Sequence, residues 1–156
     1  MSQSEDRAAL LISIRPRYVA EILAGHKTAE VRRAKPSSAP GSLMLIYATT
    51  PIQQVVATCV LAGVRTGGAD RLWHEHGMSA CLTRQQMRDY LRGAAQPTVL
   101  LLSHISELVT PVSLDRMRKV IPSFHPPQTY RFLGASVATE LAGGSATSSL
   151  GARTVM

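Results

Sequence analysis

The first half of the chain alternates between apolar runs and polar stretches, and the spacing of the apolar residues predicts its first elements. Residues 8–14 (AALLISI) form a continuous apolar run that ends at Arg15-Pro16, which is typical of a buried strand. Pro16 suits the first turn of a helix, because a missing N–H is tolerated there. Apolar residues then recur at helical spacing, at Tyr18, Val19, Ile22 and Leu23, and Gly25 provides a C-terminal stop. We predict a strand followed by a short helix with one buried stripe.

After Gly25 the period changes to two. Ala29 and Val31 point to one side of an extended segment, whereas Glu30 and Arg32 point to the other. Residues 34–41 contain two prolines and a glycine, which oppose regular strand pairing, so we predict a loop there.

The remaining segments predict further strands and one clear helix. Residues 42–50 and 54–64 are apolar and β-branched, and they are joined across Pro51. Residues 82–93 have apolar residues near helical spacing, at Leu82, Met87, Tyr90 and Leu91, with Gly93 as the stop. Residues 97–109 predict a strand bent near His104, and residues 120–134 predict a proline-rich loop running into a short aromatic strand.

The strands do not alternate regularly with helices, which favours a single α+β domain over a doubly wound parallel sheet. We expect a small mixed β-barrel of about five or six strands flanked by two or three short helices. Residues 1–7 are polar and predict a flexible N-terminus. Residues 142–156 are rich in Gly, Ser, Thr and Ala and predict a disordered tail.

Composition adds an expectation about partners and compartment. The 156 residues include 45% hydrophobic residues and carry a formal charge of +7, with an isoelectric point near 10.1. This excess favours a polyanionic partner, nucleic acid before an anionic membrane. Two cysteines, Cys59 and Cys81, are typical of free thiols in a reducing cytosol. The apolar run near the N-terminus is too short for a signal peptide or a membrane span, so we expect a cytoplasmic protein.

The segment 25–33 (GHKTAEVRR) concentrates charge and is the candidate site. Glu30 and Arg32 share a strand face and can form an ion pair. On residue physics alone, that pair is either a solvated surface bridge worth under ~1 kcal/mol or part of a ligand site. Lys27 follows the helix stop, so we expect its side chain to be free to bend over a cleft. Burial or Arg32 would lower the pKa of Lys27 and Glu30 would oppose that shift, which suits Lys27 to electrostatic contact.

Other residue types extend this candidate site. Basic residues flank the segment and can form a patch that follows a phosphate backbone, and solubility alone is the alternative explanation: Arg15, Arg17, Arg33 and Lys35. Tyr47 and Trp73 are the aromatic candidates for stacking a base, with Trp73 better suited to the core of this aromatic-poor chain.

Motifs for metal, cofactor or triad chemistry do not emerge. The pair His74 and His76 lacks a third ligand at defined spacing, so we expect no metal. The serine–histidine neighbours lack a nucleophile elbow, and residues 66–70 (TGGAD) lack the lysine of a phosphate-binding loop. We expect no cofactor.

The segment 10–33 resembles the opening of ASCH domains, which belong to the PUA-like superfamily of small β-barrels. The signature of that family is Gly-x-Lys-x-x-Glu-x-Arg after the first helix, and all of its positions are filled here, by Gly25, Lys27, Glu30 and Arg32. Residues 46–51, 72–79 and 126–133 are similar to later parts of the family. The resemblance covers residues 8–134, which we take as the domain.

The resemblance implies a cleft beside the first helix, lined by the signature residues, that binds RNA or another nucleic acid. A few members of the family are enzymes, either a ribonuclease or an amidohydrolase acting on acylated cytidine nucleosides. In those amidohydrolases the signature lysine is catalytic and a threonine stands where this chain has Glu30.

Three hypotheses follow from residues and resemblance together. The first is a protein that binds RNA or a nucleotide-like ligand, with single-stranded DNA as a further candidate, through Gly25, Lys27, Glu30, Arg32, Arg33, Arg15, Arg17 and Tyr47. The second is a ribonuclease or amidohydrolase at the same cleft, with Lys27 and Glu30 as its catalytic groups. The third is a protein-interaction module whose charge serves solubility. Binding that weakens steeply with salt would support the first hypothesis. Turnover that Lys27→Ala abolishes with folding intact would support the second, and salt-insensitive, RNA-independent behaviour the third.

Overall fold

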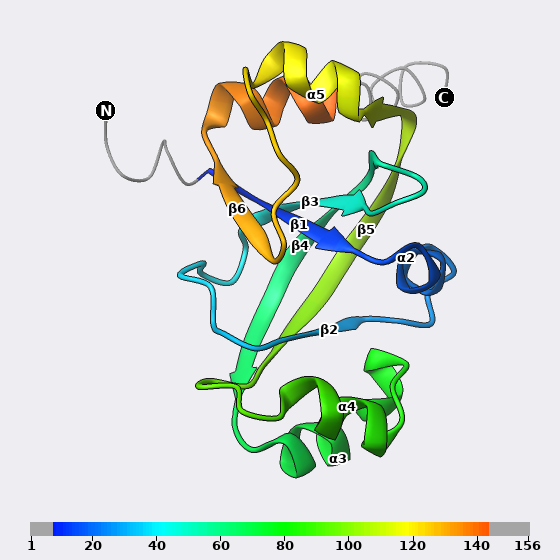
Figure 1. The fold of residues 1–156 in the computed structure, drawn as a ribbon, viewed down its shortest axis with the longest axis vertical. Coiled ribbons are helices and arrows are strands. Elements are labelled where there is room, and N and C mark those ends of the chain that lie inside the picture. The colour runs from blue at the N-terminus through cyan, green and yellow to red at the C-terminus, as the bar shows by residue number, and fades with distance from the viewer. Residues whose placement is uncertain (1–7, 144–156) are drawn as a thin grey trace, which may run out of the picture.

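A mixed six-stranded sheet curves into a half-barrel and organises the protein (Figure 1). The structure is a computed structural model and describes residues 8–143. The strands are β1 (Ala9–Ile14), β2 (Ala29–Arg32), β3 (Leu43–Ala48), β4 (Gln54–Thr66), β5 (Thr98–Ser113) and β6 (Tyr130–Leu133). Their order in the sheet is β2-β5-β4-β3-β1-β6. Only β1 and β3 are parallel among the described pairings, which confirms the predicted α+β class.

The first strand and helix form as their apolar spacing predicts. All residues of β1 are buried. Helix α2 (Pro16–Leu23) begins with Pro16 at its first position and buries Val19 and Ile22 against the sheet. Gly25 follows the helix with φ +83°, a left-handed conformation that glycine adopts without strain. The chain can therefore reverse and enter β2.

Two long antiparallel strands, β4 and β5, give the sheet its curvature. The pairing of these strands shifts register between Thr58 and Val60. His104 lies opposite this shift and has φ +51°, which confirms the bend predicted near this residue. Before the bend, β5 pairs with β2 along one of its edges. After the bend, β5 continues to Ser113, and no described strand pairs with it on that edge.

The sheet carries more helices than the predicted two or three. Helices α3 (Ala69–Ala80), α4 (Arg84–Leu91) and α5 (Leu114–Val120) join α2, and residues 135–143 are also helical. Only α2 and α4 were expected. The apolar stripe of α3 is short, with Leu72 and Ala80 its buried apolar residues, and α5 has a single fully buried residue, Met117. Neither segment shows strong helical periodicity, so tertiary packing decides its conformation.

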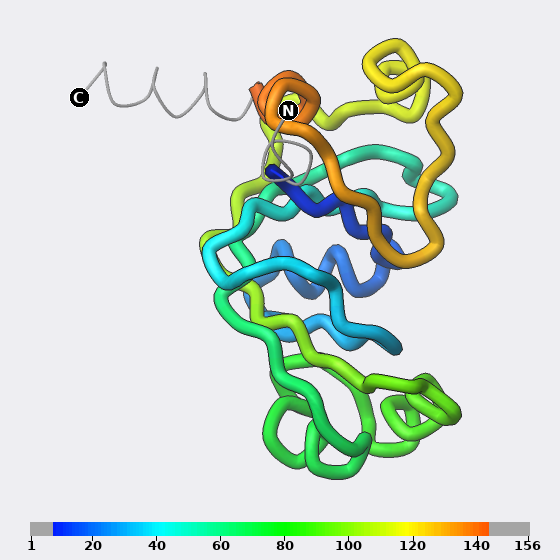
Figure 2. Tube along the Cα trace, turned by 90° about the vertical axis from the view of Figure 1, so that its left-hand side faces the viewer, coloured from blue at the N-terminus to red at the C-terminus, as the bar shows by residue number. Residues whose placement is uncertain are grey.

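Figure 2 shows the path of the chain through the sheet and the helices on it. Three apolar clusters hold these layers together. The first packs α2 on the sheet, the second packs α5 and residues 135–143 on it, and the third joins β2 to α3 and α4. Ala138 and Leu141 are buried in the second cluster, so the packed chain continues beyond residue 134. Ala142 of the predicted tail belongs to that helix. The rest of the tail, and the predicted flexible residues 1–7, lie outside the described residues.

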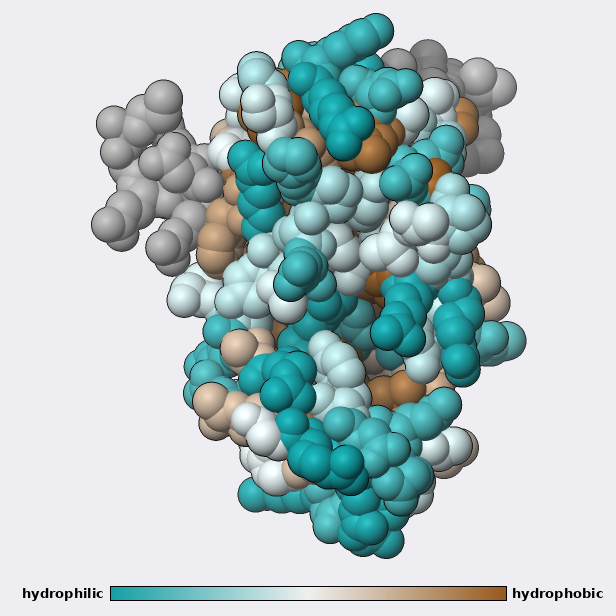
Figure 3. All heavy atoms as spheres, viewed as in Figure 1, coloured by the Kyte–Doolittle hydropathy of each residue, from teal (hydrophilic) through white to brown (hydrophobic). Residues whose placement is uncertain are grey.

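The helices of the described part of the chain are all too short or too polar to cross a membrane. The surface seen in Figure 3 is mostly hydrophilic over the α3–α4 end. Arg84 and Arg88 pair there with Asp70, and Arg92 pairs with Asp89.

Candidate functional site

The signature segment, residues 25–33, lies between helix α2 on one side and helices α3 and α4 on the other. Strand β2 pairs with β5 on one side, and Ala29 and Val31 pack with α3 and α4 in the third cluster. Glu30 and Arg32 alternate with them, as the period of two predicts, and line a cavity together with residues of α2 and β1. The strand therefore presents its charged residues to the space beside the first helix.

Lys27 is fully buried, not free to bend over a cleft as expected. Its side chain is 1% exposed, and Nζ donates a hydrogen bond of 2.6 Å to the carbonyl of Ala80. Nζ also lies 3.4 Å from Glu30 Oε1 and 5.0 Å from the ring centre of Tyr18. The expectation for Lys27 was wrong because the end of α3, more than fifty residues away, covers it.

Glu30 and Arg32 form a buried ion pair. Arg32 Nη2 lies 2.7 Å from Glu30 Oε2, with side-chain exposures of 7% and 10%. Glu30 Oε1 also accepts a hydrogen bond of 3.2 Å from the amide of Val31. The solvated surface bridge, left open by the sequence, is therefore excluded, and this carboxylate lies between two cations in a region of low dielectric.

Arg32 connects three segments that are distant in sequence. Its Nη2 donates 2.7 Å to the carbonyl of Ser13 in β1, and its Nη1 donates 3.3 Å to the carbonyl of Thr129. The Ser13 hydroxyl donates 2.6 Å to the carbonyl of Pro127. Arg32 Nε is buried without a hydrogen-bond partner within residues 8–143. The two Nη atoms of Arg32 thus already bind backbone carbonyls and Glu30. Through the Thr129 carbonyl, Arg32 holds the loop before β6.

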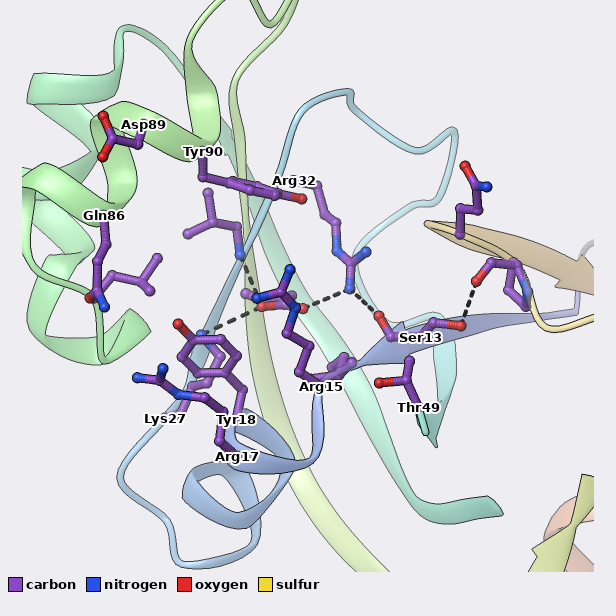
Figure 4. Close-up of a pocket in the computed structure, with 16 residues that line it drawn as sticks. Ser13, Arg15, Arg17, Tyr18, Lys27, Arg32, Thr49, Gln86, Asp89 and Tyr90 are labelled. Atoms are coloured by element: carbon purple, nitrogen blue, oxygen red, sulfur yellow. Dashed lines mark hydrogen bonds and ion pairs between the residues drawn. The ribbon is translucent and has the colours of Figure 1, made fainter. Parts of the chain in front are cut away.

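A cavity of about 570 Å³ opens beside this network (Figure 4). Residues of α2 line one wall, residues of α4 line the facing wall, and the loop before β6 closes a third side. The lining comprises Ser13, Ile14, Arg15, Arg17, Tyr18, Lys27, Glu30, Val31, Arg32, Thr49, Leu82, Gln86, Asp89, Tyr90, Pro127 and Gln128. The volume is within the range of small-molecule and nucleotide sites.

The structure divides the predicted site residues into two groups. Arg15, Arg17, Lys27, Glu30 and Arg32 line the cavity together. Gly25, Arg33 and Tyr47 do not appear in its lining.

These three residues have other surroundings. Gly25 makes the turn before β2. Arg33 Nη1 donates 2.6 Å to the carbonyl of Tyr90 and 2.9 Å to that of Arg92, so it connects β2 to the end of α4. Tyr47 is 1% exposed and packs in the second cluster, below α5.

The electrostatics of the buried network favour a readily released proton on Lys27. Burial lowers the pKa of Lys27 below its ordinary value of 10.5, and the opposing effect of Glu30 does not cancel it. These are the directions expected for burial and for a neighbouring carboxylate. The proton of Lys27 is therefore released more easily than that of an exposed lysine.

Sequence reasoning missed the residues that α4 and the loop before β6 contribute. Gln86, Asp89, Tyr90 and Gln128 all line the cavity. Tyr90 was expected on the apolar stripe of its helix together with Met87 and Leu91. Met87 and Leu91 are buried, whereas Tyr90 is 40% exposed. The signal available was its position at the edge of that stripe, next to Asp89.

Within the described residues, no group of three or more His, Cys, Asp or Glu side chains is arranged to hold a metal ion.

Comparison with known proteins places this fold and segment in a recognised group. A family model, described as ASCH domain, matches residues 12–106. A curated protein of Zymomonas mobilis subsp. mobilis, named ASCH domain-containing ribonuclease, is 34% identical over 133 residues, covering 85% of this chain and 89% of that protein. The crystal structure of ASCH from Zymomonas mobilis has a TM-score of 0.82 at 33% identity and covers 88% of this chain and 96% of that one. The N-terminal domain of Staphylothermus marinus McrB shares the fold alone, with a TM-score of 0.58 at 10% identity and coverage of 88% and 94%.

Proposed function

Because the chain belongs to the ASCH domain family, we propose that it binds RNA and that the cavity between α2, β2 and α4 is the binding site. The charge of the cavity lining is the observation that carries this proposal. Four cationic side chains line it, Arg15, Arg17, Lys27 and Arg32, against two carboxylates, Glu30 and Asp89. Cationic clefts attract phosphate and release counterions on binding.

The internal contacts decide which cations are available to RNA. Lys27 and Arg32 are already engaged with Glu30 and with backbone carbonyls. Arg15 and Arg17 are exposed at the start of α2 and lie on the cavity wall. Arg15 and Arg17 therefore contact the phosphates. The ion pairs of Glu30 with Lys27 and Arg32 form the floor of the site.

Cleavage of the bound RNA is the second candidate function, and the 34% identical relative named a ribonuclease favours it. In internal cleavage the 2′-oxygen attacks the adjacent phosphorus and the bond to the 5′-oxygen breaks. A proton leaves the 2′-hydroxyl and another reaches the departing 5′-oxygen. Lys27 and Glu30 are the groups on the cavity floor that can exchange these protons, and Arg15 and Arg17 neutralise the phosphate.

The test combines binding and cleavage in one experiment. Labelled short RNA of mixed sequence is incubated with the full chain and read on native and denaturing gels at several salt concentrations. We expect a salt-sensitive shift that the double variant Arg15→Ala/Arg17→Ala weakens, with the salt slope falling by about 0.7 for each phosphate that the variant no longer neutralises. Lys119→Ala removes an exposed charge on α5, outside the cavity lining, and is the matched control.

The outcomes separate the hypotheses. Shortened RNA that persists in Lys119→Ala and disappears in a folded Lys27→Met variant establishes the ribonuclease. A shift with intact RNA establishes a binding protein without cleavage. Neither shift nor cleavage overturns the RNA proposal, and acylated cytidine nucleosides then become the substrates to assay.

A further inference from the structure

Three aromatic rings of the described chain already have other partners. The Tyr18 ring has the Arg17 guanidinium 4.7 Å and the Lys27 ammonium 5.0 Å from its centre. Trp73 packs against the third cluster and its indole N–H donates 3.0 Å to the carbonyl of Leu82. Tyr47 is buried in the second cluster.

Tyr90 differs from these rings. It is 40% exposed, it lines the cavity, and its side chain makes no hydrogen bond or ring contact within residues 8–143. An exposed ring on a cavity wall offers a flat apolar surface on which a base can stack.

The backbone of Tyr90 is held firmly although its ring is open. Met87 and Leu91, on either side of it in α4, are buried in the third cluster. Arg33 donates hydrogen bonds to the carbonyls of Tyr90 and Arg92 and thereby ties this turn to β2. The backbone that carries the ring is therefore held in place, so a stacking ligand has to order only the side chain of Tyr90.

The facing wall supplies charge. Arg15 and Arg17 project from α2, and Figure 4 shows them across the cavity from the side chains of α4. Arg15 makes no side-chain hydrogen bond or ion pair within the described part of the chain. One wall thus offers an aromatic surface and the other offers guanidinium groups, the two features that a single nucleotide needs.

We propose that Tyr90 is a base-stacking residue and that the cavity takes one unstacked nucleotide, with its base on Tyr90 and its phosphate on Arg15 and Arg17. This inference rests on the proposed function and adds the substrate class, single-stranded RNA. Bases inside a duplex are covered by their neighbours and must leave the stack to enter a pocket, which is unfavourable. Stacking reads the face that all bases share, so we expect weak dependence on base identity.

The experiment compares single-stranded and duplex probes with the full chain. The probe is a 2′-fluoro RNA of about eight nucleotides, labelled for fluorescence anisotropy, alone or annealed to its complement. It lacks the 2′-hydroxyl and so cannot undergo internal cleavage. A second set of probes carries 2-aminopurine at each position in turn, because its fluorescence changes when it stacks on a ring.

Three variants test separately the aromatic ring of Tyr90, its hydroxyl group, and a change outside the cavity. We expect Tyr90→Ala to weaken single-strand binding about tenfold and to abolish the 2-aminopurine signal, whereas Tyr90→Phe keeps both. Met78→Ala removes a side chain that is 92% exposed on α3, outside the cavity lining, and is expected to bind as the parent does. Thermal unfolding of each variant confirms that it folds.

The failures are distinguishable. Equal binding of single strand and duplex, with Tyr90→Ala unchanged and Arg15→Ala/Arg17→Ala weakened, overturns the stacking inference and leaves RNA binding in place. Binding of neither probe overturns both. Single-strand preference that disappears in Tyr90→Ala and is retained in Tyr90→Phe supports the inference.

Discussion

The ammonium of Lys27 and the carbonyl of Ala80 meet at 2.6 Å, which joins the segment that leads into β2 to the last residue of α3. Helix C-terminal carbonyls carry partial negative charge and favour a cation. With Glu30 on its other side, Lys27 has negative partners in two directions. A residue that the sequence presents as a flexible ligand contact is a structural connection between the strand and the α3–α4 unit.

Removing the Lys27 ammonium should destabilise the fold. In Lys27→Met the side chain keeps a similar length, but the Ala80 carbonyl loses its donor and Glu30 loses one cation. We expect the free energy of unfolding to fall by about 3 kcal/mol, measured by urea denaturation. A loss below about 1 kcal/mol would mean that the network contributes little, as exposed pairs do.

A double-mutant cycle isolates the pair. Glu30→Gln alone leaves Lys27 and Arg32 without their carboxylate. If the two residues are coupled, the double variant Lys27→Met/Glu30→Gln should be less destabilised than the sum of the single variants, by about 0.5–3 kcal/mol. Strict additivity would contradict a direct interaction.

The lowered pKa of Lys27 should make its contribution to the free energy of unfolding depend on pH. Its pKa is lowered by burial in the folded state, so between that pKa and 10.5 the unfolded chain binds more protons at this residue. The stability contribution of Lys27 therefore rises with pH across that interval. We expect the destabilisation in Lys27→Met, measured by urea unfolding, to grow as pH is raised from neutral toward 10.5.

The comparison with Lys27→Met also controls for other groups. Burial raises the pKa of Tyr47 and raises that of Cys59 to about 12, and both titrate in parent and variant alike. Their contributions cancel in the difference. A difference that stays flat or shrinks on going alkaline would show that the Lys27 pKa is not lowered.

Arg32→Lys should loosen the loop before β6 even though charge is kept. One ammonium cannot replace two guanidinium nitrogens that reach the carbonyls of Ser13 and Thr129. We expect amide exchange at Ser13, whose N–H donates to the Thr129 carbonyl, to become about tenfold faster. Unchanged exchange there, with the protein still folded, would show that the Ser13 hydroxyl contact with Pro127 is enough to hold the loop.

Gly77 is the position in α3 where a methyl group has no room. A Cβ there would lie 2.4 Å from Trp73 Nε1, whose N–H donates to the Leu82 carbonyl. We expect Gly77→Ala to lower the free energy of unfolding by about 1–3 kcal/mol and to shift the fluorescence of Trp73, the single tryptophan of the chain. Gly68→Ala meets nothing within 4 Å and serves as the control.

Much of the fold follows from local pattern. The continuous apolar run before Pro16 is a buried strand, the period of two at residues 28–32 belongs to a strand with a charged face, and the bend falls at His104. In each case the residues that decide the conformation are neighbours in the sequence.

The exceptions all depend on distant partners. Helices α3 and α5 have weak stripes and are helical because they pack on β2 and the sheet. The cavity needs α4 opposite α2, a relation that no local period contains. For that reason the exposed aromatic side chain of the site is Tyr90, while Tyr47, on an apolar strand, is buried.

The hydrogen bonds of Arg32 have a consequence for protein engineering. They reach residue 13 on one side and residue 129 on the other, and Lys27 reaches residue 80. A peptide of residues 25–33, or the same letters grafted onto another scaffold, would carry the charges without the carbonyls that orient them. The signature side chains therefore take up this arrangement only when most of the chain has folded around them.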